Sequence, residues 1–135
     1  MTIQFSTDIR NATLDVVEST IGTSPIMRIR TGSVPATPAT ADAGTVLATL
    51  TLPSDWMAAA SGGTKVIAGT WQDTSADASG TAAHFRIYDS GGTVCKAQGT
   101  VTATGGGGDM TVDNVVFASG QAFTVVTFTL TAGNA

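Results

Sequence analysis

Charged side chains are scarce in this sequence. They make up 12% of its 135 residues, hydrophobic residues make up 42%, and the formal net charge is −4. The six Lys and Arg residues are scattered along the chain, whereas binding of nucleic-acid phosphates requires clustered basic side chains. We therefore expect no nucleic-acid partner, and a surface covered mainly by Thr, Ser, Gly and Ala.

Cysteine and histidine each occur once, as Cys95 and His84. One cysteine cannot form an internal disulfide, and one Cys with one His cannot supply a metal site, so we expect no metal and no cofactor. Cys95 alternates with its neighbours in a predicted strand and fits a small buried apolar group, but a reactive thiol or a bond between subunits stays open. His84 has no nucleophile or orienting acid in a recognisable motif around it. We predict no catalytic residue and no enzymatic activity.

Long apolar runs are also missing. No stretch approaches the roughly 18 residues of a membrane helix, and the segment Met1–Phe5 lacks the basic start and apolar core of a signal peptide. We expect no membrane partner and a protein that is made and used in an aqueous compartment.

The most informative stretch runs from Ala83 to Thr104. Phe85 and Ile87 alternate with His84, Arg86 and Tyr88, and a glycine-containing turn leads into a second alternating segment. This pattern predicts a β-hairpin with one buried and one wetter face.

One helix is predicted, over residues 6–21, with a cap at its start and Gly22 at its end. At 100° per residue, one apolar stripe faces away from the acidic side chains, and we expect that stripe to pack on the sheet. The apolar arc extends further, so that three residues would stay partly exposed. A helix wedged into its own fold and a helix that also touches another subunit both fit this pattern. The predicted sheet-facing stripe is Phe5, Ile9, Ala12 and Val16, and the candidate subunit contacts are Leu14, Val17 and Ile21.

The rest of the chain reads as strands separated by turns. A long irregular loop is predicted over residues 32–44, and loops of that length are usually functional or mobile. Four glycines at 105–108 predict a turn or a mobile tip, and residues 123–132 predict a long strand in the centre of its sheet. We therefore expect one domain over residues 1–135, mainly β, with an antiparallel β-sandwich of jelly-roll or immunoglobulin-like type and one N-terminal helix.

Aromatic side chains offer one alternative function. Trp56, Trp71 and Tyr88 could serve as stacking platforms for sugar rings, although tryptophans in β proteins more often pack in the core.

Several segments also carry a resemblance to a known family. The segments are LPSDWMAAASGG (52–63), GTW (69–71), GTAAHFRIY (80–88), TATGGGGDM (102–110) and FTLTAGNA (128–135). They resemble small virion structural proteins encoded by tailed bacteriophages and prophages, and the similarity covers nearly the whole chain.

The resemblance implies that the protein is part of a virion, and it assigns no active-site or ligand-binding residue. It implies a non-enzymatic virion protein, assembled in the cytoplasm of the host bacterium, that decorates or cements the outside of the particle. The expected place is the capsid, with the neck or collar and the tail as the next choices. The expected partners are further copies in a homo-oligomer and the major capsid, neck or tail protein. The alternative is a carbohydrate-binding module that attaches the virion to its host.

Overall fold

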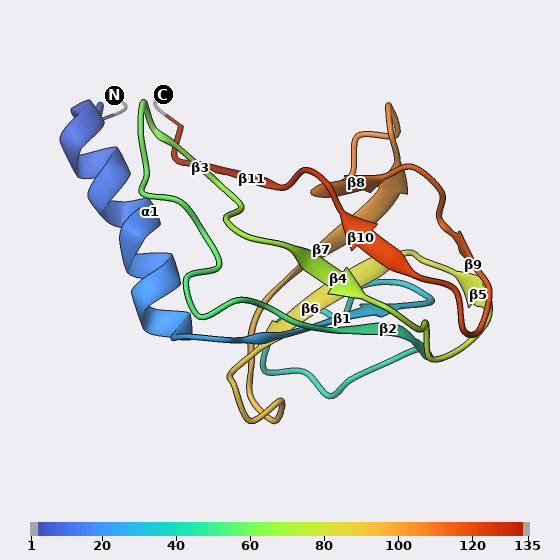
Figure 1. The fold of residues 1–135 in the computed structure, drawn as a ribbon. Coiled ribbons are helices and arrows are strands. Elements are labelled where there is room, and N and C mark those ends of the chain that lie inside the picture. The colour runs from blue at the N-terminus through green and yellow to red at the C-terminus, as the bar shows by residue number, and fades with distance from the viewer. Residues whose placement is uncertain (1–2, 134–135) are drawn as a thin grey trace.

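The computed structural model describes residues 3–133, and within this range it is mainly β with one N-terminal helix and a curled sheet (Figure 1). The elements in chain order are α1 (Thr7–Ile21), β1 (Ile26–Arg30), β2 (Val46–Thr51), β3 (Thr64–Val66), β4 (Trp71–Asp73), β5 (Gly80–Thr81), β6 (His84–Tyr88), β7 (Cys95–Ala103), β8 (Met110–Val112), β9 (Val116–Phe117), β10 (Phe123–Val125) and β11 (Thr129–Thr131).

Helix α1 begins and ends where its capping residues predict. The Ser6 hydroxyl accepts a hydrogen bond from the amide of Ile9 at 3.4 Å, which satisfies one of the free donors of the first turn. Gly22 adopts a φ of 95°, and its amide donates to the carbonyl of Glu18 at 2.9 Å. The predicted helix is therefore confirmed.

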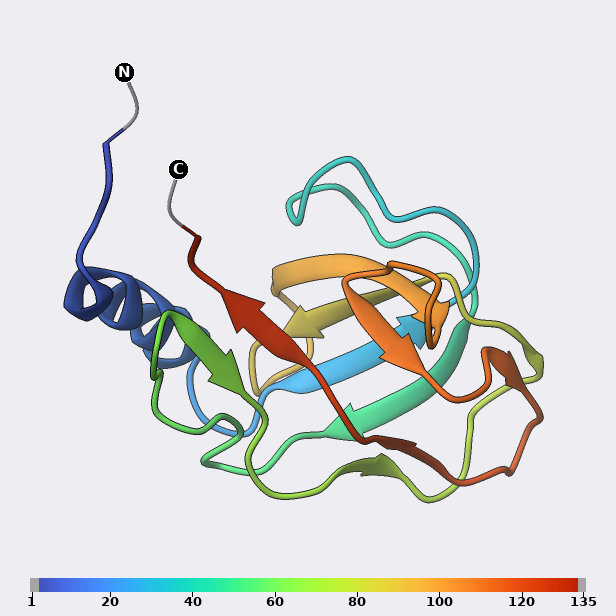
Figure 2. The same cartoon turned by 90° about the horizontal axis from the view of Figure 1, so that it is seen from above.

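The largest sheet has five strands in the order β2-β1-β6-β7-β8. The predicted hairpin forms its centre, because β6 and β7 pair antiparallel with Phe85 opposite Gly99 and Ile87 opposite Ala97. Phe85 and Ile87 are buried in the core as expected. The other face of β6 is not wet, however, because residues 32–44 arch over it (Figure 2). We call this segment the strap.

The glycine-rich turn produces an arrangement that the sequence does not predict. After β7 the chain loops back to the level of Val101, and β8 then runs beside β7 in the same direction, with Val101 opposite Met110. The sheet is therefore not wholly antiparallel. The turn folds closely onto Thr102: a Cβ atom at Gly106 would lie 2.7 Å, and one at Gly108 2.9 Å, from Thr102 atoms. Glycine is required here because a side chain would collide with the strand.

Short strand pairs cover the opposite side of the core. β3 pairs with β11 and β4 with β10, each antiparallel, in two-stranded ribbons that lie across the five-stranded sheet (Figures 1 and 2). The predicted long strand over 123–132 is therefore wrong in length and position. It is split into β10 and β11, and within residues 3–133 each half pairs with a strand on one edge alone.

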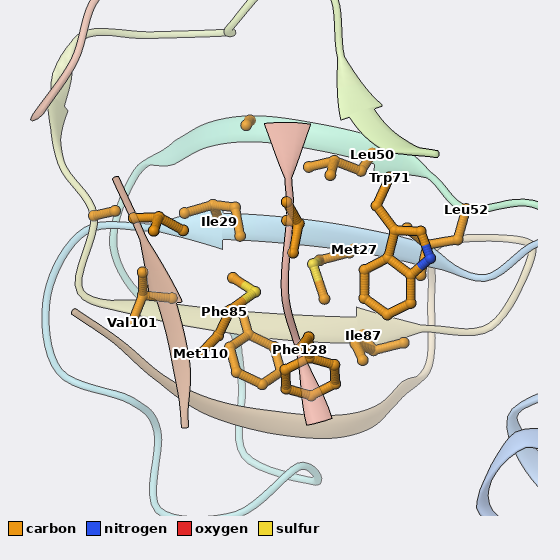
Figure 3. Close-up of a cluster of buried hydrophobic side chains, with 14 of the residues drawn as sticks. Met27, Ile29, Leu50, Leu52, Trp71, Phe85, Ile87, Val101, Met110 and Phe128 are labelled. Atoms are coloured by element: carbon orange, nitrogen blue, oxygen red, sulfur yellow. The ribbon is translucent and has the colours of Figure 1, made fainter. Parts of the chain in front are cut away.

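The core lies between these ribbons and the five-stranded sheet. Phe128 bridges the two sides: its ring centroid is 5.8 Å from that of Trp71 and 5.4 Å from that of Phe85, to which it is nearly perpendicular. Figure 3 shows the rings of Phe128 and Phe85 next to each other within this buried cluster. Offset and edge-to-face aromatic contacts of this kind add to the free energy gained from burial.

Candidate functional site: an exposed helix stripe and a strapped polar cluster

Helix α1 presents to the surface the side that sequence reasoning places against the sheet. Ile9 and Val16 are 50% and 58% exposed, whereas Leu14 and Ile21 are 5% and 8% exposed. The expectation that Leu14 and Ile21 stay partly exposed is wrong, and Val17 is half-buried. The surface-exposed apolar stripe, which we call the helix stripe, consists of Phe5, Ile9, Ala12 and Val16.

A buried lysine explains this reversal. Lys65 of β3 is 1% exposed, and its ammonium lies 2.6 Å from a carboxylate oxygen of Asp15 and 2.7 Å from one of Glu18. Burial alone would lower the pKa of Lys65, but the hydrogen bonds and charges of the two carboxylates outweigh it and raise the pKa. The acidic side of the helix must therefore face the protein, because an unpaired buried ammonium is strongly unfavourable.

Further polar contacts hold the same side of the helix. Asn11 accepts a hydrogen bond from the amide of Gly63 at 2.9 Å, and Asp15 accepts one from the amide of Ala60 at 3.0 Å. The guanidinium of Arg10 donates to the carbonyl of Ala132 at 3.3 Å. The helix thus contacts the rest of the protein through its polar residues and through Leu14 and Ile21, which are buried on the same side. The helix stripe is left on the outside.

An apolar groove continues from the helix stripe towards the sheet. Two hollows of about 290 and 280 Å³ share Val17, Ile21 and Ala97 in their walls. Val16 of the helix stripe lines the outer hollow, and Phe128 and Leu130 line the inner one. Val16 therefore connects the helix stripe to this groove, whose walls are mainly apolar but also contain Lys96 and Asp109.

The three candidate sugar-stacking rings are buried. Trp56 and Trp71 pack against each other with ring centroids 5.8 Å apart, and Trp71 donates from its indole to the carbonyl of Trp56 at 3.0 Å. Tyr88 lies beneath the guanidinium of Arg28, which is 4.6 Å from the ring centroid. None of the three presents a free ring face to a sugar, and the structure does not bring them together as a platform.

A second cluster lies between the strap and the outer face of β1 and β6. Asp42, the only charged residue of segment 32–44, forms ion pairs with Arg86 and, at 3.0 Å, with Arg30. The hydroxyl of Tyr88 donates to the same carboxylate at 2.7 Å. Burial alone would raise the pKa of Asp42, but the bond from Tyr88 and the charges of both arginines outweigh it and lower the pKa.

Backbone groups of the strap complete this cluster. Arg86 donates to the carbonyls of Pro38 and Thr40 at 2.8 and 3.0 Å, and Gln98 donates to the carbonyl of Pro35 at 2.6 Å. The long loop of the sequence is therefore a strap that is fastened by side chains of β1, β6 and β7.

His84 and Cys95 adjoin this cluster. Buried His84 donates from Nδ1 to the carbonyl of Gly32 at 2.8 Å, and burial lowers its pKa. Half-buried Cys95 donates to the carbonyl of Ala97 at 3.3 Å. His84 and Cys95 do not hydrogen-bond to each other, and within residues 3–133 no catalytic triad forms around them.

Residues 3–133 contain neither a metal-binding cluster nor a membrane-spanning helix. Among residues 3–133, no three His, Cys, Asp or Glu side chains lie close enough together to hold a metal ion. In the same part of the chain, no helix has the length and apolar character needed to cross a bilayer.

Sequence reasoning missed Lys65 and Asp42. Each could have been noticed as a lone charge in an otherwise neutral segment, Lys65 among Gly, Thr, Val and Ile and Asp42 among Ala, Thr, Pro and Gly. Their partners are 50 and 44 positions away in sequence, and no local pattern identifies them.

Comparison of the chain with protein-family models, with curated proteins and with solved structures finds no match in any of the three. Function must therefore be inferred from the residues and their geometry.

Proposed function

We propose that this protein is a non-enzymatic structural component of a tailed-phage particle. It attaches to the outside of the particle. The capsid is the favoured location, and the neck or tail is the second candidate. The observation that carries the proposal is the helix stripe, because helix α1 is docked through its polar side and leaves Ile9 and Val16 about half exposed. Exposed apolar patches of this kind mark contact surfaces.

The energetics favour a contact role for this stripe. Fully burying an Ile, Val or Phe side chain contributes roughly 1.5–3 kcal/mol, so burying the exposed halves of two such residues could change an affinity about tenfold or more. The adjoining groove, with Val17 and Ile21 in its walls, extends the surface that a neighbouring subunit could cover. The low charge of the whole chain fits neutral contacts with further copies and with virion proteins.

We also propose that the fold is a two-layered β-sandwich. We take the five-stranded sheet as one layer and the β3–β11 and β4–β10 ribbons as the second layer of a β-sandwich of jelly-roll or immunoglobulin-like type. The layered core around Phe128 supports this assignment. Long-range NMR contacts from Phe128 to both Trp71 and Phe85 in solution would test it.

The decisive experiment compares two double variants. Ile9→Gln/Val16→Gln alters the helix stripe, and Val66→Gln/Val126→Gln removes two exposed valines elsewhere, at 46% and 66% exposure. Each variant is mixed with particles that lack the protein, and the bound copies are counted by quantitative mass spectrometry. We expect the first pair to reduce binding about tenfold or more and the second to leave it within twofold.

The same measurement locates the protein, because copy number separates a capsid decoration from a neck ring or a tail tip. Equal binding by both double variants would contradict the assigned contact surface. Absence of the protein from purified particles, with no binding to them, would overturn the proposed function itself.

A further inference from the structure

The strapped cluster contains more buried positive charge than negative charge. Arg86 and Arg30 are 1% and 7% exposed, and within residues 3–133 Asp42 is the one carboxylate that forms an ion pair with either. His84 adds no compensating negative charge, since a histidine is neutral or positive. Two buried guanidinium groups thus share one carboxylate, and a buried charge without a full partner is unfavourable.

The donors of these arginines are also incompletely used. The Nε–H groups of both Arg30 and Arg86 are buried and have no hydrogen-bond partner. Asp42 contacts terminal nitrogens of the two side chains and leaves the Nε edge of each unoccupied by a carboxylate. The planar guanidinium fork matches the paired oxygens of carboxylate and phosphate groups, so this cluster has unused capacity for an oxyanion.

A hollow lies against the side chain of Arg86. It has a volume of about 510 Å³ and lies between the strap and the turn that joins β6 to β7. Arg86 and Asp42 are in its wall together with Tyr88, Thr93 and Cys95. The volume exceeds that of a phosphate or acetate ion, so a bound anion need not displace Asp42.

We propose that this hollow binds a small oxyanion, a carboxylate or phosphate group, which pairs with Arg86 beside Asp42. The anion brings a second negative charge to Arg86, which otherwise shares the charge of Asp42 with Arg30. Since Arg86 also holds the carbonyls of Pro38 and Thr40, an occupied site stiffens the strap as well. This site does not depend on the helix stripe or on the proposed role in the particle.

Cys95 provides a reporter inside the site, because it is the only cysteine of the chain and lines the hollow. The wild-type protein is titrated with sodium phosphate and, separately, with sodium acetate, with chloride keeping the ionic strength constant. The rate of Cys95 alkylation by iodoacetamide and the Tm are followed together. We expect saturable slowing of alkylation and a rise in Tm of about 4 °C at ten times the Kd. The anion that acts at the lower concentration identifies the group that the site prefers.

Two variants of equal net charge locate the effect. Asp42→Asn removes the negative charge next to the hollow, and Asp113→Asn removes one that lies outside it. The Kd for the preferred anion should fall about tenfold in Asp42→Asn, because a like charge at contact distance no longer opposes the anion, and stay within twofold in Asp113→Asn.

The wild-type titration decides the proposal even if Asp42→Asn folds poorly. The proposal would be overturned if neither phosphate nor acetate changed the rate of Cys95 alkylation in the wild-type protein. It would also be overturned if chloride slowed the reaction equally. Equal gains in the two folded variants would also overturn it, because the anion would then respond to net charge and not to this site.

Discussion

Lys65 of β3 and Asp15 of α1 form an ion pair in which the ammonium nitrogen lies 2.6 Å from the carboxylate oxygen. The lysine is buried, whereas the side chain of Asp15 is 48% exposed. This pair, reinforced by Glu18, determines which side of the helix faces the protein. It thereby leaves the helix stripe at the surface, where the proposed function requires it.

The first prediction concerns this ion pair. Replacing both acids in Asp15→Asn/Glu18→Gln leaves the buried ammonium unpaired and should lower the free energy of unfolding by about 3 kcal/mol or more. Lys65→Met removes the buried charge itself and should change it by less than about 1 kcal/mol, because the two acids remain partly in contact with water. Urea unfolding measures both. A larger loss in Lys65→Met than in the double variant would contradict this account.

The second prediction tests the orientation of the helix. Leu14→Ala should lower the free energy of unfolding by about 2–5 kcal/mol, because Leu14 lies on the buried side of the helix. Val16→Ala should change it by less than about 0.5 kcal/mol, since Val16 is exposed and alanine has the higher helix propensity. Thermal or urea unfolding of the two variants is the measurement. The opposite order would mean that the helix packs through its apolar stripe.

The third prediction concerns pH and His84. Burial lowers the pKa of His84 below its ordinary value of 6.5, so the unfolded chain takes up a proton at a higher pH than the folded chain does. The free energy of unfolding should therefore fall as the pH drops below 6.5. His84→Gln can keep the bond to the Gly32 carbonyl while removing the titration.

Urea unfolding at pH 7, 6 and 5 checks this expectation, with the variant giving a flatter profile than the wild type. A further loss below pH 4 should persist in both proteins. The pKa values of Asp15, Asp42 and Asp89 all lie below their ordinary 3.8, so these acids contribute stability that is lost as the pH falls through their folded values. Identical slopes between pH 7 and 5 would refute the role assigned to His84.

The fourth prediction concerns Gly99 in the central hairpin. A Cβ atom there would lie 2.8 Å from the ring of Phe85, which is closer than carbon atoms approach each other. Gly99→Ala should lower the free energy of unfolding by about 1–3 kcal/mol through overpacking. Gly133→Ala, where a Cβ meets no atom within 4 Å, is the matched control and should have an effect below about 0.5 kcal/mol. Equal melting temperatures of the two variants would show that the Phe85 ring can move aside.

The local sequence was sufficient to predict the hairpin, the helix bounds and the mainly β class. The reason is that Ser6 and Gly22 act on backbone groups within a few positions, and the alternation around Phe85 and Ile87 reports a two-residue period. These features depend on neighbours in the chain.

Tertiary structure decided the rest. The orientation of α1 follows from Lys65, and the burial of the outer face of β6 follows from Asp42; each partner lies more than 40 positions away in sequence. The amphipathic pattern of the helix was misleading because burial of an apolar stripe competes with the pairing of a buried ammonium, and the pairing prevailed. The prediction of one continuous strand over residues 123–132 was wrong for a related reason. β10 pairs with β4 and β11 with β3, and these pairings between distant segments form only when the chain folds.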